Sequence, residues 1–146
     1  MKKGKKRVIT GFGVFLGLTL LGAVIFYMSF TTIEVSGISM QPTLKDHQHV
    51  LVSKAYWLIG SIHDKDIVVL NDPTGPGHII KRVMWMAGEN VDYRWRPDSA
   101  PASDKPYPVP EGCIYVLGDN RPFSEDSRKF GFVDMKQVIG KVVVYK

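Results

Sequence analysis

The sequence is poor in cysteine and, beyond its first residues, in net charge. Its one cysteine, Cys113, cannot form an internal disulfide, and its position in an apolar run favours a place in the core. Of the 19 lysine and arginine residues, 14 balance the 14 acidic residues, and the other five are Lys2, Lys3, Lys5, Lys6 and Arg7. The body also lacks a cluster of basic side chains interleaved with aromatic ones, which argues against a nucleic-acid partner.

Charge is absent altogether from residues 8–30. At about 1.5 Å per residue, a helix of this length can cross a hydrocarbon core of about 30 Å. A cleaved secretory signal is the alternative, but its apolar region is usually about 7–15 residues and ends at a small-x-small site, which this stretch does not form convincingly. Because basic residues precede the stretch, we expect a cytoplasmic tail (1–7), a transmembrane anchor (8–30) and an extracytoplasmic domain (31–146).

The expected outer domain has room for one core and shows a mainly β pattern. Short apolar runs alternate with turn residues such as Asp72-Pro73, and helical periodicity is weak and confined to residues 134–138. The polar, proline-rich stretch 97–110 is predicted to be a surface loop. The predicted strands are Thr32–Val35, His49–Ser53, Asp66–Leu70, His78–Met86, Asn90–Tyr93, Ile114–Leu117 and Gly140–Tyr145.

Three motifs occur in order along this domain. Residues 36–44 match S-G-x-S-M-x-P-T-L, residues 66–69 form an apolar run that is followed by Lys81-Arg82-Val83, and residues 118–131 match G-D-N-R-x-x-S-x-D-S-R-x-x-G. Together they resemble the type I signal peptidases (leader peptidases of family S26), over most of residues 35–146 apart from the variable middle. The resemblance implies a compact antiparallel β-domain of the signal-peptidase/LexA-like type and a membrane-bound serine endopeptidase that removes signal peptides.

The chemistry of the matched residues agrees with that activity. A serine hydroxyl is a poor nucleophile without a base, and the motifs place no histidine at a family catalytic position. Lysine can act as the base only when it is neutral, and burial against apolar side chains lowers its pKa. Strand alternation lets only one of Lys81 and Arg82 face inward. The resemblance makes Ser39 the nucleophile and Lys81 its base.

The resemblance also assigns supporting roles. Ser124 would hydrogen-bond the Lys81 amine, Asp126 and Arg128 would pair to hold their loop, and Asp119 and Arg121 would reinforce it. The Ser39 N–H would be the first oxyanion donor. Some relatives carry a hydroxyl at the position of Gly37, so the second donor stays open. The shallow pockets for small side chains at the first and third positions before the cut would be shaped by Val35, Met40, Leu44, Ile79 and Ile80.

Several features depart from the family pattern or admit two interpretations. Lys65 and Trp85 stand where the family commonly has glycine, which puts the local turns in doubt. The short segment between Lys81 and Gly118 indicates that the second β-domain of larger relatives is absent. The aromatic groups at residues 56–59, at residues 84–86 and at Trp95 could rest on lipid or could pack in the core.

The expected partners are secretory preproteins and the lipid bilayer. No metal or organic cofactor is implied, since His47 and His49 have no evident third ligand. A catalytically silent, membrane-tethered binding domain of the same fold is one alternative function. A LexA-like self-cleaving protein is another, although such proteins normally carry a DNA-binding head where this chain has an apolar span.

Overall fold

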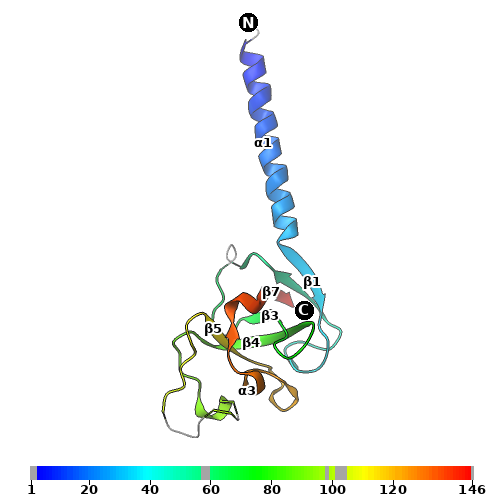
Figure 1. Ribbon diagram of the computed structural model, residues 1–146. Helices are drawn as coiled ribbons and strands as arrows, with labels where there is room; N and C mark the ends of the chain where they lie inside the picture. The colour runs from blue at the N-terminus through cyan, green and yellow to red at the C-terminus, as the bar shows by residue number, and fades with distance from the viewer. Residues whose placement is uncertain (1–2, 57–59, 98, 101–104, 146) are drawn as a thin grey trace. The chain divides into compact units, whose positions relative to one another are not determined.

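The computed structural model describes residues 3–56, 60–97, 99–100 and 105–145, which form two units divided after Phe30. The first unit contains helix α1, Lys3–Met28, shown in blue in Figure 1. Its segment Gly11–Met28 is long and apolar enough to cross a membrane. The helical conformation expected for the apolar stretch is therefore present, and its insertion into a membrane stays a prediction.

The second unit is built on an antiparallel β-sheet, as the sequence predicts. Its strand order is β1-β2-β7-β3-β4-β5-β6, so that β3, β4 and β7 lie side by side in Figure 1. The β2–β7, β7–β3, β3–β4, β4–β5 and β5–β6 pairs are all antiparallel. The strands are β1 (Phe30–Glu34), β2 (His49–Ser53), β3 (Ile67–Asn71), β4 (His78–Met86), β5 (Cys113–Leu117), β6 (Val133–Asp134) and β7 (Val138–Tyr145).

Strand β3 supplies apolar side chains to both faces of the sheet. Ile67 and Val69 pack with the core cluster that contains Val35, Met40 and Leu44. Val68 and Leu70 alternate with them and pack into the second cluster, whose other buried members are Ile62, Val83, Ile114, Val116, Val133 and Val138. Because successive strand residues point to opposite faces, one five-residue strand links the two clusters.

Strand β4 follows the same alternation and thereby places a lysine in the core. Lys81 pairs across the ladder with Val68 and is only 4% exposed, whereas its neighbour Ile80 packs against the first cluster. Side chains directly opposite each other on one face of an antiparallel pair lie in contact distance. The sheet register therefore determines which of Lys81 and Arg82 is desolvated.

Most of the predicted strands are present. β2 and β4 have the predicted bounds, and β1, β3, β5 and β7 differ from them by one or two residues at their ends. The prediction of a strand at Asn90–Tyr93 is wrong beyond a single bridge from Asn90 to Pro108. The Asp92 side chain accepts a hydrogen bond from the Arg94 N–H and caps a 3-10 helix, Tyr93–Trp95, which ends the extended conformation. The predicted helical turn is present as a 3-10 helix, Met135–Gln137.

The prediction of a surface loop at 97–110 is wrong at its C-terminal end. Residues 98 and 101–104 lie outside the described part of the chain, but Val109 is 2% exposed. Its N–H donates to Glu89 O, and the Val91 N–H donates to Tyr107 O. These bonds hold the end of the stretch beside residues 88–91, and Val109 packs there with Val91 and Tyr115.

Lys65 and Trp85, which stand where the family commonly has glycine, fit the fold in different ways. Lys65 adopts the left-handed conformation, with φ of 67°, so the turn before β3 keeps the backbone that glycine favours. Trp85 lies at an irregularity in the β4–β5 register, and its ring packs edge-on against Tyr115 at 5.7 Å. Trp85 and Trp95 both join the cluster around Tyr115, in agreement with the core alternative. Residues 57–59 of the other aromatic group lie outside the described part of the chain.

Gly140 of β7 lies close to β2, and a substitution there tests the described packing of these strands. A Cβ at this position would lie 2.6 Å from Ser53 O and 2.6 Å from Val52 Cγ1. We expect Gly140→Ala to lower the free energy of unfolding by about 1–3 kcal/mol, because backbone or core atoms must move. The measurement is urea denaturation in detergent, followed by tryptophan fluorescence.

Gly75→Ala is the matched control for this change. A Cβ at Gly75 meets nothing within 4 Å, so stability should stay within about 0.5 kcal/mol of wild type. Equal stability of Gly140→Ala and Gly75→Ala would contradict the described packing of β7.

Candidate active site

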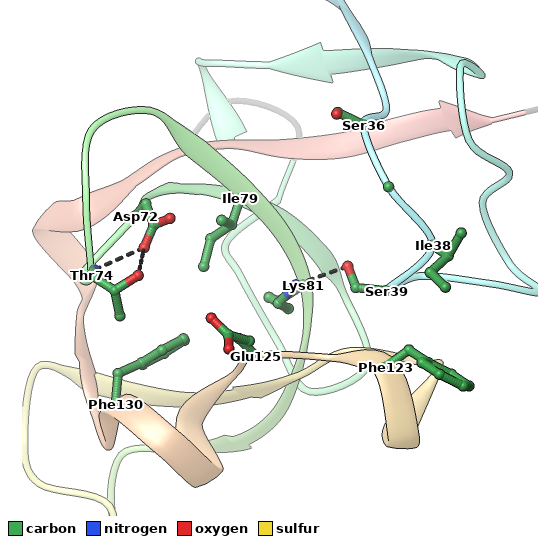
Figure 2. A pocket seen from close by; sticks show the side chains of 11 residues that line it. Ser36, Ile38, Ser39, Asp72, Thr74, Ile79, Lys81, Phe123, Glu125 and Phe130 are labelled. Carbon is green, nitrogen blue, oxygen red and sulfur yellow. Dashed lines mark hydrogen bonds between the residues drawn. The ribbon is translucent and has the colours of Figure 1, made fainter.

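Ser39 and Lys81, which are 42 residues apart in the sequence, meet in the structure. Ser39 lies in the turn that follows β1, and Lys81 lies in the middle of β4. Lys81 Nζ and Ser39 Oγ form a hydrogen bond of 2.9 Å (Figure 2). An amine at this distance from a hydroxyl is within reach of its proton when the amine is neutral.

The surroundings of Lys81 favour the neutral amine. Burial lowers the pKa of Lys81, because desolvation disfavours the ammonium form. The carboxylates of Asp126, Asp72 and Glu125 oppose this effect, in that order of importance, but the net direction is downward. At a given pH, a larger fraction of Lys81 is therefore neutral than of an exposed lysine.

The Ser39 turn lies directly against the third motif. The Asn120 N–H donates to Ser39 O at 2.9 Å. A Cβ at Gly118 would lie 2.7 Å from the same oxygen, so the approach requires glycine there. On the other side of the turn, the N–H of Gly37 donates to Asp46 Oδ1 at 2.7 Å. The Ser39 turn is thus held on one side by the main-chain N–H of Asn120 and on the other by the side-chain carboxylate of Asp46.

The ion pair predicted between Asp126 and Arg128 is present. Arg128 Nε and Nη2 donate to the two carboxylate oxygens at 2.8 and 2.9 Å, and Arg128 Nη2 also donates to Arg121 O. Burial alone would raise the pKa of Asp126. The hydrogen bonds from Arg128 and from the Gly118 N–H outweigh burial and hold that pKa below its usual range. Asp126 thereby links the loop to the end of β5.

Asp119, expected to reinforce the loop of the third motif, pairs with Arg82 of β4. Arg82 Nε and Nη2 donate to the two oxygens of Asp119 at 2.8 and 2.7 Å, and Nη1 donates to Lys65 O. Arg82 pairs with Leu117 in the β4–β5 ladder, which places its side chain close to Asp119. The guanidinium of Arg121 instead lies 4.8 Å from the Trp95 ring centroid. The family resemblance, together with strand alternation, predicted the outward direction of Arg82 but not its acidic partner.

The hydrogen bond expected between Ser124 and Lys81 is not formed in this structure. Ser124 Oγ is buried and has no hydrogen-bond partner within the described residues. Its hydroxyl is directed at Gly118, where a Cβ would lie only 2.1 Å from the Oγ. Ser124 thus packs against the Gly118 backbone, and it also contributes to the lowered pKa of the nearby Asp126.

Two cavities adjoin Ser39 and Lys81. The smaller, of about 100 Å³, is lined by four of the five residues expected to bind substrate, Val35, Met40, Ile79 and Ile80. The fifth, Leu44, lines neither cavity and is fully buried in the first core cluster. Its N–H bonds to Met40 O, so the turn directs Leu44 beneath Met40 and into the core.

The larger cavity, of about 270 Å³, also adjoins Ser39 and Lys81 (Figure 2). It combines the apolar side chains of Ile79, Phe123 and Phe130 with the carboxylates of Asp72 and Glu125. Ile79, Ser39 and Lys81 line both cavities. An extended peptide whose carbonyl carbon reached Ser39 Oγ would lie next to both cavities.

A hydroxyl held against a desolvated amine, beside two cavities of an antiparallel β-domain, is the geometry required of a serine hydrolase with a lysine base. The comparisons with known proteins place the chain more narrowly. The family model described as "Signal peptidase, peptidase S26" matches residues 7–100 and 94–145. The chain belongs to this family of peptidases.

The individual relatives agree with the family. Signal peptidase I of Bacillus caldolyticus is 34% identical, with 77% of each chain covered. Signal peptidase I of Bacillus amyloliquefaciens is 32% identical, with 82% of this chain and 75% of that one covered. A crystal structure of a signal peptidase I from Enterococcus faecalis V583 is 27% identical, with a TM-score of 0.47, and covers 57% of this chain and 98% of that one.

The lowered pKa of Lys81 generates a prediction for the pH dependence of peptidase activity. If Lys81 is the base, kcat/KM should fall as the pH drops through its pKa, and this acidic limb should lie below the usual lysine value of about 10.4. Glu125→Gln removes a carboxylate that raises the pKa of Lys81, so it should move the limb to lower pH. A pH profile of preprotein cleavage measures the shift.

Glu111→Gln, at an exposed position outside both cavities, is the control and should leave the limb in place. A limb that moved upward in Glu125→Gln, or moved equally in both variants, would contradict this account of Lys81.

The buried Asp126 generates a prediction for stability. We expect Asp126→Asn to lower the free energy of unfolding by about 3 kcal/mol at neutral pH, because Arg128 loses a buried, charged partner. Since the pKa of Asp126 is lowered in the folded state, its contribution is full above the unfolded value of about 3.9 and is lost as the pH falls through the folded value. Urea denaturation at several pH values should therefore show the two proteins converge in acid. A difference independent of pH would contradict the assignment to the ion pair.

Proposed function

We propose that this peptidase removes signal peptides from secretory preproteins, with Ser39 as nucleophile and Lys81 as general base. The observation that carries the proposal is the 2.9 Å hydrogen bond between a buried, pKa-lowered amine and the Ser39 hydroxyl. Membership of the signal peptidase family and relatives named signal peptidase I support the choice of substrate.

The two residues account for the proton transfers of both half-reactions. Neutral Lys81 takes the proton of Ser39 Oγ while the oxygen attacks the scissile carbonyl carbon, and the Ser39 N–H faces the oxygen that becomes negative. The Lys81 ammonium then gives its proton to the departing amine, which leaves an ester on Ser39. Lys81 next takes a proton from water, the hydroxide attacks the ester, and the proton returns to Ser39 Oγ as the new carboxyl group leaves.

The small cavity accounts for the choice of cleavage position. Val35, Met40, Ile79 and Ile80 line a volume of only about 100 Å³ beside Ser39. A cavity of this size admits small side chains and excludes large ones by overlap with packed residues. We assign it to the small residues at the first and third positions before the cut.

The site does not depend on a metal ion in this proposal. The described residues contain no group of three or more His, Cys, Asp or Glu side chains arranged to hold one. The amine of Lys81 supplies the base that a metal-bound water would otherwise supply.

Helix α1 supports a membrane location for the reaction. Gly11–Met28 is apolar throughout, and the residues before it are basic. The positive-inside rule places such an N-terminus in the cytoplasm, so the peptidase domain would stand on the extracytoplasmic side. In this proposal the bilayer and the signal peptides within it are the partners, and nucleic acid is not one.

Cleavage of a preprotein by the detergent-solubilised protein tests the proposal. We expect Ser39→Ala and Lys81→Ala each to lower kcat by at least about 1000-fold, because they remove the nucleophile or its base. Lys81→Arg should be equally inactive, since arginine does not give up its proton. The measurement is the appearance of the mature product on a gel.

Ser61→Ala, an exposed serine outside both cavities, is the control and should cut like wild type. Full activity of Ser39→Ala would show that the mechanism is wrong. A wild-type protein that cut no preprotein would instead favour the catalytically silent binding domain.

A further inference from the structure

Asn120 contacts the nucleophile turn through two separate donors. Its main-chain N–H donates to Ser39 O at 2.9 Å, and its side-chain Nδ2 donates to Ile38 O at 3.1 Å. The first carbonyl belongs to the peptide unit that follows the Ser39 Cα, and the second belongs to the unit that precedes it. One residue therefore holds both peptide units that flank the nucleophile.

The side-chain bond acts on the group that would bind the oxyanion. Ile38 C=O and Ser39 N–H are the two ends of one planar peptide unit, so the direction of the carbonyl fixes the direction of the N–H. A carbonyl that accepts hydrogen bonds also polarises its peptide unit and strengthens the N–H as a donor. The Asn120 amide thus influences the orientation and the strength of the Ser39 N–H without contacting it.

The bonds of Gly37 to Asp46 and of Ser39 to Lys81 hold the turn on either side of this peptide unit but do not act on its carbonyl. Ile38 is 43% exposed, so packing of its side chain does not anchor it. Gly37, which precedes it, has φ of 91° and no side chain. The other donor to Ile38 O is the Gln41 N–H at 3.1 Å, which lies within the same turn. Of these two donors, Asn120 is the one that ties the unit to the rest of the domain.

We propose that Asn120 is a positioning residue that aims the Ser39 N–H at the developing oxyanion, through the peptide unit shared by Ile38 and Ser39. The proposal rests on the proposed function, and it adds a residue of the third motif to the oxyanion-binding machinery. Asn120 acts through Ser39, so its effect belongs to the transition state and not to substrate binding.

Two substitutions separate the side-chain bond from the main-chain bond. Asn120→Ala removes the amide donor and keeps the N–H bonded to Ser39 O. Asn120→Asp keeps the shape of the side chain but presents only acceptor oxygens to Ile38 O. We expect kcat for preprotein cleavage to fall about 10- to 100-fold in Asn120→Ala, less than for loss of an oxyanion donor itself, and further in Asn120→Asp. KM should stay within about twofold of wild type.

Two further measurements distinguish positioning from a merely structural role. Affinity for a peptide boronic acid, which forms a tetrahedral adduct with serine, should fall in parallel with kcat, whereas affinity for the corresponding peptide amide should not. The acidic limb of the pH profile of Asn120→Ala should coincide with that of wild type, because the surroundings of Lys81 are intact. Asn90→Asp, at an exposed position, is the control and should behave as wild type.

The outcomes separate this proposal from the function on which it rests. If wild type cuts no preprotein, the proposed function fails and this proposal fails with it. If wild type cuts and Asn120→Ala keeps full kcat, only the role of Asn120 is overturned. The role is likewise overturned if KM rises while kcat is unchanged, or if kcat falls only together with the temperature of unfolding.

Discussion

The burial of one amine is the constraint on which the site depends. A lysine can take a proton from serine only when it is neutral, and desolvation is what makes Lys81 neutral more readily. The β3–β4 register supplies that desolvation, because it sets Lys81 opposite Val68 on an apolar face of the sheet. A slip of one residue would bury Arg82 instead, and arginine cannot be deprotonated in a protein. The register of two strands is therefore a chemical requirement as well as a structural one.

The same sheet brings the third motif to the Ser39 turn. β5 pairs with β4, so that the chain leaving Leu117 reaches the Ser39 turn, where the Asn120 N–H donates to Ser39 O. Arg82 and Asp119 form a bidentate ion pair that links β4 to the start of this motif. Lys81 and Arg82 are adjacent and point to opposite faces of β4. Lys81 contacts Ser39, and Arg82 binds Asp119 in the segment whose Asn120 holds the Ser39 turn.

Sequence reasoning predicted the parts of the site that are local or carried by motifs. The contact of Ser39 with Lys81 and the pair of Asp126 with Arg128 fall in this class. Alternation along β4 predicted that one basic residue would face inward, and the family resemblance predicted that it would be Lys81. Contacts between distant segments were not predictable. The ion pair of Arg82 with Asp119 depends on the pairing of Arg82 with Leu117 in the β4–β5 ladder, and the sequence alone does not give that register. Leu44 and Val109 show the same limit. Both are apolar, and the sequence alone does not tell whether an apolar residue lines a cavity, lies on the surface or packs in the core. The main-chain hydrogen bonds of each residue place it in the core.

Asp126 has two opposing effects, one on the loop of the third motif and one on the pKa of Lys81. Asp126 is needed to hold the Gly118 N–H and the loop, yet a buried negative charge near Lys81 raises the pKa of the amine and works against a neutral base. Arg128 lies two residues further on and donates to both oxygens of Asp126. An ion pair presents a weaker field to its surroundings than a single charge does, because the two contributions partly cancel. Arg128 therefore allows Asp126 to organise the loop at a lower electrostatic cost to Lys81 than an unpaired carboxylate would impose.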